Sequence, residues 1–181
     1  PSCSQWNTFV EEIIEKAGAS IPDWKSGSSS TQRSNKPAAI HEIVYSEENR
    51  LITPDKELNR VLGGGIVSGS IVLIGGEPGI GKSTLMLQLS EWMGKQNKKT
   101  LYCSGEESTE QIRLRSKRLK VTSENIYLLC TNNAEHIIEA IEENKPDLVI
   151  VDSIQSVSIP SLDALPGTVT QLRETTSRLL R

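Results

Sequence analysis

The sequence is poor in aromatic residues and in cysteine. Phe, Trp and Tyr make up 4% of its 181 residues, so a core must be built mainly from aliphatic side chains. Its three cysteines are widely spaced and do not indicate a disulfide framework. No apolar run approaches the roughly 20 residues that span a bilayer, and no secretory signal pattern opens the chain. These absences predict a cytoplasmic protein in a reducing compartment, with no membrane partner.

The sequence also lacks a strong excess of charge and clear ends. A formal net charge of -3 gives no basic body that would by itself indicate nucleic acid binding. No Met opens the chain, and its last residues continue a helical pattern without a stop signal, so we expect a part of a longer protein. Three regions are predicted: a remnant with a short helix at 1–17, a Gly/Ser/Pro-rich linker at 18–39, and a main domain at 40–181.

The strongest signal lies at residues 76–83, which read G-x-x-x-x-G-K-S, the phosphate-binding P-loop pattern. An apolar run of strand length, 71–74, precedes it, and good helix formers follow from Leu85. Strand, glycine loop and helix N-terminus form the context that the motif needs, which makes a chance glycine-rich turn a poor alternative. The predicted nucleotide-binding residues are Gly76, Glu77, Pro78, Gly79, Ile80, Gly81, Lys82, Ser83 and Thr84.

Each part of this loop has a chemical reason. Glycines let backbone N–H groups approach phosphate oxygens, and the helix N-terminus adds its positive dipole end. Lys82 can reach the β- and γ-phosphates and so is also a catalytic candidate, while the Ser83 hydroxyl can ligate Mg²⁺. The sequence therefore predicts a site for a nucleoside triphosphate and Mg²⁺.

Strand and helix patterns alternate through the rest of the chain. A short helix should begin at Thr53-Pro54, with Leu58, Val61 and Leu62 on its buried side, and 40–45 is a candidate edge strand. The P-loop helix should run to about Gln96. Further strands are predicted at 71–75, 100–103, 126–130 and 148–152, and further helices from Ser108 or Thr109, at 134–143 and at 168–181. This alternation predicts an α/β fold with a mostly parallel sheet and helices on both faces.

Three carboxylates stand at predicted strand ends. Asp152 closes the apolar run 148–151, the Walker B form, and at the carboxyl edge of the sheet it could hold Mg²⁺. Glu106 and Glu107 follow the strand at 100–103, where a carboxylate could polarise the water that attacks the γ-phosphate. The alternative is that both acids only favour the dipole of the next helix. We prefer Glu106, which is nearer the strand end.

Other titratable residues give weaker signals. The basic run from Arg113 to Lys120 could meet DNA or an acidic neighbour, although such runs are more often solvated helix faces. We expect Cys103 and Cys130 to be small buried hydrophobes, and His41 and His136 to lie on the surface.

Several motifs together resemble one family. They are RVLGGGIV-x-GS at 60–70, GEPGIGKST at 76–84, YCSGEES at 102–108, DSIQ at 152–155 and PGTVTQLRE at 166–174. This set is similar to RadA (also called Sms), the bacterial RecA-like DNA-repair ATPases, and the resemblance runs almost end to end. Cys3 to Thr8 also resembles the end of that family's N-terminal four-cysteine zinc finger.

The resemblance implies a RecA-like core that hydrolyses ATP with Mg²⁺. Lys82 and Ser83 would take the P-loop roles, Asp152 the Walker B role and Glu106 the activation of water. Cys3 would be the fourth ligand of Zn²⁺ in the full-length protein. The family forms homo-hexameric rings on single-stranded DNA and drives branch migration of recombination intermediates.

The sequence departs from the family in its extent and in one short motif. The finger lacks its other cysteines, and the residues at 53–58 replace the usual T-G-x-x-E-L-D. RecA-like cores place a later strand between 71–75 and 148–152, so we expect those two strands to lack a neighbour and the core to be incomplete at its C-terminal end. Two alternatives use the same core: a nucleotide switch or kinase of the circadian-clock type, and a replicative-helicase relative. The finger remnant argues against the helicase.

Overall fold

The computed structural model describes residue 39 and residues 50–180. The predicted N-terminal helix, the linker, the edge strand at 40–45, Cys3 and His41 all lie outside the described residues, so those expectations stay predictions. None of the described helices combines the length and the apolar character that crossing a bilayer requires.

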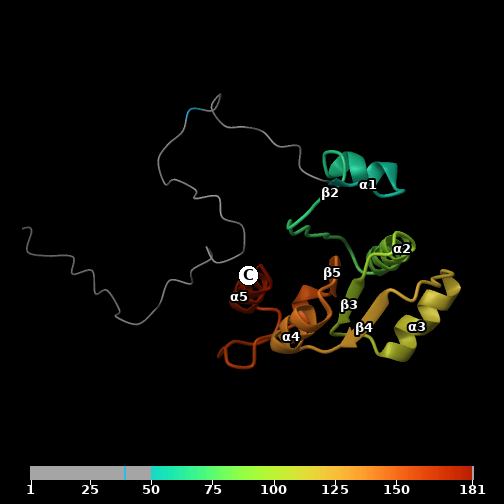
Figure 1. The fold of residues 1–181 in the computed structure, drawn as a ribbon. Coiled ribbons are helices and arrows are strands. Elements are labelled where there is room, and N and C mark those ends of the chain that lie inside the picture. Colours follow the sequence, from blue (N-terminus) through green and yellow to red (C-terminus); the bar gives the residue numbers. More distant parts are fainter. Residues whose placement is uncertain (1–38, 40–49, 181) are drawn as a thin grey trace, which may run out of the picture. The chain divides into compact units, whose positions relative to one another are not determined.

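A three-stranded parallel sheet forms the centre of the domain (Figure 1), in the order β4 (Ile126–Cys130), β3 (Thr100–Ser104), β5 (Leu148–Asp152). In the register of the sheet, Ser104 pairs with Cys130 on one side and with Asp152 on the other. The carboxyl ends of all three strands therefore meet at one edge, where α/β folds bind their ligands. The predicted α/β class and the strands at 126–130 and 148–152 are confirmed.

Helices cover both faces of this sheet, and β3 supplies alternate residues to each face. Leu101 and Cys103 are buried in a cluster with α4 (Ala134–Asn144) and the segment that follows β5, and α5 (Val169–Leu179) packs against it. On the other face, Tyr102 and Ile150 pack with Leu87 of α2 (Lys82–Lys95) and Ile112 of α3 (Thr109–Arg118). Each face of the sheet therefore packs into a separate cluster, and both clusters are mainly aliphatic, with Tyr102 as the aromatic member of the second.

The C-terminal half of α2 is fixed at the amino edge of the sheet. Both carboxylate oxygens of Glu91 accept hydrogen bonds from the segment just before β4, including the backbone N–H groups of Thr122 and Ser123 at 2.9 Å. The side-chain amide of Asn125, in the same segment, donates to the backbone oxygen of Gly94. The helix therefore runs antiparallel to the strands, and its N-terminus points to the carboxyl edge.

A smaller unit precedes the P-loop. In it β1 (Arg50–Leu51) pairs antiparallel with β2 (Ile66–Val67), and α1 (Lys56–Val61) lies between them in sequence. Gly65 has φ +130, and a Cβ there would stand 2.6 Å from the Leu51 carbonyl oxygen, so the approach of the two segments requires glycine.

The predicted start of α1 is wrong by two residues. The N-cap is Asp55, whose Oδ1 accepts hydrogen bonds from the backbone of Glu57 and Leu58. Thr53 instead bonds the side chain of Asn59 through its backbone N–H and its hydroxyl. Both residues are good caps, and the Asn59 contact takes Thr53 out of that role. Val61, expected on the buried side, is 72% exposed.

The predicted strand at 71–75 does not form. These residues have no regular secondary structure, and Ile71, Val72 and Leu73 are exposed. Within the described part of the chain, β5 is paired on one side only, with β3. A strand needs a neighbour for its backbone groups, and the expectation that 71–75 and 148–152 lack one agrees with this arrangement.

The two described cysteines differ from each other. Cys103 is buried in the sheet, and burial raises the pKa of its thiol to about 12. Cys130 is exposed, so its predicted burial is wrong. Its position at the carboxyl end of edge strand β4 explains the difference. His136 is on the surface, as expected.

Candidate functional site

The P-loop wraps around the side chain of Lys82. The Lys82 Nζ donates hydrogen bonds of 2.8 Å to the backbone oxygen of Gly76 and of 2.9 Å to that of Glu77. Gly79 and Gly81 have φ values of +82 and +110, in the left-handed region that other residues rarely adopt. The sequence produces a closed loop here because its glycines fall where the chain reverses.

The first turn of α2 lacks a side-chain cap. Its N-cap is Gly81, which makes no side-chain hydrogen bond to the helix. The N-cap residues of the other described α-helices are Asp55, Ser108, Asn133 and Thr168, and each of these side chains accepts a hydrogen bond from a backbone N–H. The α2 N–H groups and the positive end of the dipole are thus left for an external anion, and these residues fit a phosphate group.

Asp152, at the end of β5, is held by a neighbouring strand. The hydroxyl of Tyr102 on β3 donates a 2.6 Å hydrogen bond to Oδ2 of Asp152. Burial raises the pKa of Tyr102, and the bond to the Asp152 carboxylate raises it further, so this hydroxyl keeps its proton at neutral pH. The donor set of Ser83 and Asp152, a hydroxyl and a carboxylate, suits Mg²⁺.

Glu106 lies beside the end of β5. Its Oε1 accepts a 2.6 Å hydrogen bond from the hydroxyl of Ser153. The preceding Gly105 donates its N–H to the backbone oxygen of Asp152 at 3.3 Å. A Cβ at Gly105 would stand 2.3 Å from the Ser156 hydroxyl oxygen, so glycine lets this loop lie against the turn after β5. Glu106 and Asp152 therefore share one edge of the sheet.

Glu107 has a different environment from Glu106. Its carboxylate forms an ion pair with Arg115 of α3, and its backbone N–H donates a 3.0 Å hydrogen bond to the Ser104 hydroxyl. Arg115 is half-buried, whereas Arg113, Lys117 and Arg118 are exposed. The basic run thus divides into one arginine that pairs with Glu107 and a solvated face.

Comparison with known proteins bears directly on this loop-and-strand arrangement. A family model described as an AAA domain matches residues 37–168, which is most of the chain and includes the P-loop, β3 and Asp152. The chain belongs to the AAA domain family.

Relatives extend this result and confirm the RadA resemblance. A protein of Bacillus subtilis named "DNA repair protein RadA" is 47% identical over 100% of this chain and 39% of its own length. Proteins of the same name from Chlamydia muridarum and Halalkalibacterium halodurans are 46% and 48% identical. The chain spans about 39% of the length of these relatives.

The AAA domain brings some predicted site residues together and leaves others apart. Glu106, Glu107 and Asp152 meet at the carboxyl edge, and the N-terminus of α2 points to that edge. Lys82 and Ser83 make no hydrogen bond or ion pair with Asp152 among the described residues. No group of three His, Cys, Asp or Glu side chains in this part of the chain could hold a metal alone, so a Mg²⁺ ion here would draw on water and phosphate oxygens as well.

Sequence reasoning missed Tyr102, Arg115 and Ser153 as site residues. Tyr102 did leave a signal, because it is a polar aromatic in a strand of a chain with 4% aromatic residues. The partners of the other two depend on sheet register and on the path of the 104–108 loop.

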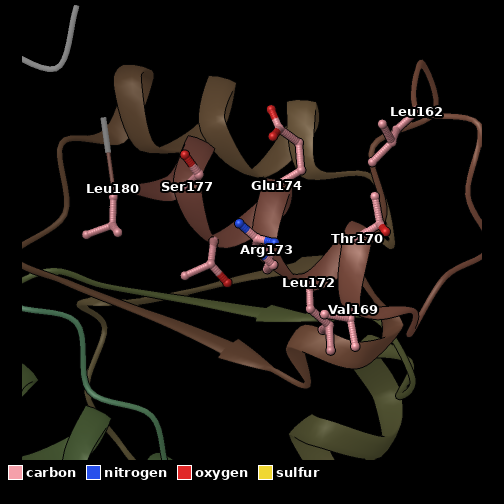
Figure 2. A pocket seen from close by; sticks show the side chains of 9 residues that line it. Leu162, Val169, Thr170, Leu172, Arg173, Glu174, Ser177 and Leu180 are labelled. Carbon is pink, nitrogen blue, oxygen red and sulfur yellow. The ribbon is translucent and has the colours of Figure 1, made fainter. Parts of the chain in front are cut away.

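A hollow of about 670 Å³ lies along α5, which follows the residues matched by the AAA family model (Figure 2). Its walls include Leu162, Val169, Arg173, Ser177 and Leu180. None of the residues that line this hollow is a predicted site residue, so we do not assign it to the nucleotide site.

Proposed function

We propose that this chain forms the nucleotide-binding core of a DNA-dependent ATPase that acts in recombinational DNA repair. The observation that carries the proposal is that the N-terminus of α2 and the Asp152 end of β5 face the same edge of the sheet. The uncapped N-terminus of α2, fixed in direction by Glu91 and Asn125, points to the edge where β5 ends in Asp152. A triphosphate and a cation need these two features side by side.

Each residue has a proposed role at this site. Backbone N–H groups of residues 76–84 bind phosphate oxygens, and Lys82 moves its ammonium group from the loop carbonyls to the phosphates. Ser83 and Asp152 would hold Mg²⁺, which neutralises charge on the phosphates when it is bound. Glu106 orients and polarises the attacking water, and Glu107 keeps the loop in place through Arg115.

The biological setting is proposed from the relatives. Because they are named DNA repair proteins, we propose a role in DNA repair. On the resemblance of the sequence motifs to the RadA family, we further propose single-stranded DNA and recombination intermediates as partners, branch migration as the process and a homo-hexamer as the full-length assembly, with the cytoplasm as the location. Zn²⁺ binding through Cys3 in the full-length protein is proposed on the same ground.

One experiment tests this function. Phosphate release by the full-length protein is measured with ATP and Mg²⁺, with and without single-stranded DNA. We expect ATP hydrolysis that single-stranded DNA stimulates on the order of tenfold. The Lys82→Ala variant should be inactive with and without DNA. A rate of hydrolysis that single-stranded DNA leaves unchanged would favour the nucleotide switch or the kinase. Absence of ATP binding would contradict the proposed function.

A further inference from the structure

We propose that Tyr102 is a positioning residue for the cation site, because its hydroxyl holds one oxygen of Asp152 in place and leaves the other to the cation. The inference rests on the proposed function, since it concerns the same Mg²⁺. Tyr102 touches neither nucleotide nor water in this role and acts only through Asp152.

The Tyr102 ring is fixed by packing. Tyr102 is 1% exposed, and it lies in β3, which has a hydrogen-bonded strand on either side. Leu87 of α2, Ile112 of α3 and Ile150 of β5 belong to the same buried cluster. Close packing between two helices and the sheet fixes the position of the ring and of its hydroxyl. The hydrogen bond from this hydroxyl therefore restricts the position of the Asp152 carboxylate.

Register explains how the hydroxyl reaches Asp152. Tyr102 pairs with Ile150, and Ser104 pairs with Asp152, so the two side chains are diagonal neighbours on one face of the sheet. Their 2.6 Å separation is typical of a hydrogen bond from a hydroxyl to a charged carboxylate. Among the described residues no second donor bonds the Asp152 carboxylate, so Oδ1 is left for a cation or its water.

A purely structural role predicts something different. A buried tyrosine hydroxyl needs a partner, and Asp152 could simply satisfy it. In that case, removal of the hydroxyl would change stability and leave the cation dependence of nucleotide binding unchanged. Partners that orient metal ligands typically contribute 10–100-fold to metal affinity.

The test measures cation dependence in binding. A fluorescent ATP analogue is titrated into full-length protein in EDTA and over a series of Mg²⁺ concentrations, for the wild type and for Tyr102→Phe. In EDTA we expect equal affinities within about twofold, because Lys82 and the P-loop are untouched. The Mg²⁺ concentration for half-maximal tightening should rise about tenfold. Tyr127→Phe is the matched control, because Tyr127 is exposed on β4 and should leave both values unchanged.

Asp152→Asn supplies a second arm. If Tyr102 acts through Asp152, the double variant should need the same Mg²⁺ concentration for half-maximal tightening as Asp152→Asn alone. An unchanged half-saturation in Tyr102→Phe, or a full second effect in the double variant, would overturn the inference. Nucleotide binding by the wild type that is absent or indifferent to Mg²⁺ would instead defeat the proposed function itself.

Discussion

Ser153, the residue after Asp152, donates a 2.6 Å hydrogen bond from its hydroxyl to Oε1 of Glu106. The neighbouring Glu107 is bound instead to Arg115 of α3. Two adjacent glutamates therefore differ in their partners. The Glu106 carboxylate is bonded by a hydroxyl at the end of β5, whereas the Glu107 carboxylate is engaged in an ion pair with the half-buried Arg115, so Glu106 is the better placed of the two to meet a water at the sheet edge.

Glu106→Gln should bind ATP as the wild type does and hydrolyse it on the order of 100-fold more slowly. The amide keeps the size of the side chain and its contact with Ser153 but cannot act as a base. Equilibrium binding and single-turnover hydrolysis in the full-length protein separate the two effects.

Glu107→Gln is the matched control for that experiment. It should leave the chemical step within a few-fold of the wild type and lower thermal stability, because it breaks the Arg115 ion pair. If Glu107→Gln alone abolishes hydrolysis, the assignment within the pair is reversed.

Lys82→Ala should weaken binding of a triphosphate by on the order of tenfold or more and abolish turnover. Within the described part of the chain the ammonium group bonds only loop carbonyls, so the far-ultraviolet circular dichroism and the melting temperature should change little. Lys117→Ala, an exposed lysine on α3, controls for the loss of one positive charge. Wild-type affinity in Lys82→Ala would contradict the assignment of the loop.

Glu91→Gln should destabilise the protein by about 1–3 kcal/mol at neutral pH, since a buried charged acceptor is lost. Glu91 is 7% exposed and accepts hydrogen bonds from Thr122 and Ser123, with Lys95 as an ion-pair partner. Urea unfolding of both proteins measures the difference.

The same difference should depend on pH. Burial acts to raise the pKa of Glu91, but the hydrogen bonds from Ser123, Thr122 and Lys95 outweigh it and lower the pKa below its ordinary value of 4.5. The unfolded chain therefore takes up this proton at higher pH than the folded one. The contribution of Glu91 to the free energy of unfolding should be complete above pH 4.5. It should shrink as the pH falls through the lowered pKa that Glu91 has in the folded protein. A difference that stays constant down to pH 3 would contradict this account.

Gln171→Met should cost about 1–3 kcal/mol of stability. The side chain is 1% exposed; its oxygen accepts from the Ile159 backbone N–H, and its amide donates to backbone oxygens of Ile159, Leu162 and Ala164. Methionine fills the volume but leaves these groups unbonded. Limited proteolysis should reveal new cleavage within 159–165, and Gln155→Met, at an exposed position, should not.

The exposed apolar segment 71–73 should promote self-association of the 1–181 chain. Among residues 50–180, β5 pairs on one side only, and Leu73 is 82% exposed, so both backbone and side chains are available to another molecule. Light scattering should show association that rises with concentration and that Leu73→Lys reduces. A strictly monomeric chain would argue that these surfaces are covered.

Residue patterns in the sequence predict most of the core, but few of the side-chain contacts in the candidate site. The strands at 126–130 and 148–152 are apolar runs bounded by polar residues, and their length is local information. The segment 71–75 has the same pattern and is not a strand, because pairing depends on a neighbour. Thr53 and Asp55 are equally good caps, and only the Asn59 contact separates them. The bond from Tyr102 to Asp152 joins residues of two strands, so it follows from register, which no single segment encodes.

Because the first turn of α2 has no side-chain cap, hydrogen exchange along this helix should report whether the P-loop is occupied. With Glu91 holding its far half and no side chain completing its start, the amides of Ser83 and Thr84 should exchange with solvent deuterium quickly while those near Met93 exchange slowly. A phosphate at the helix start would supply the missing acceptors and slow the early amides selectively. Exchange rates along this one helix would therefore read out occupancy of the P-loop, without any label and before any turnover has occurred.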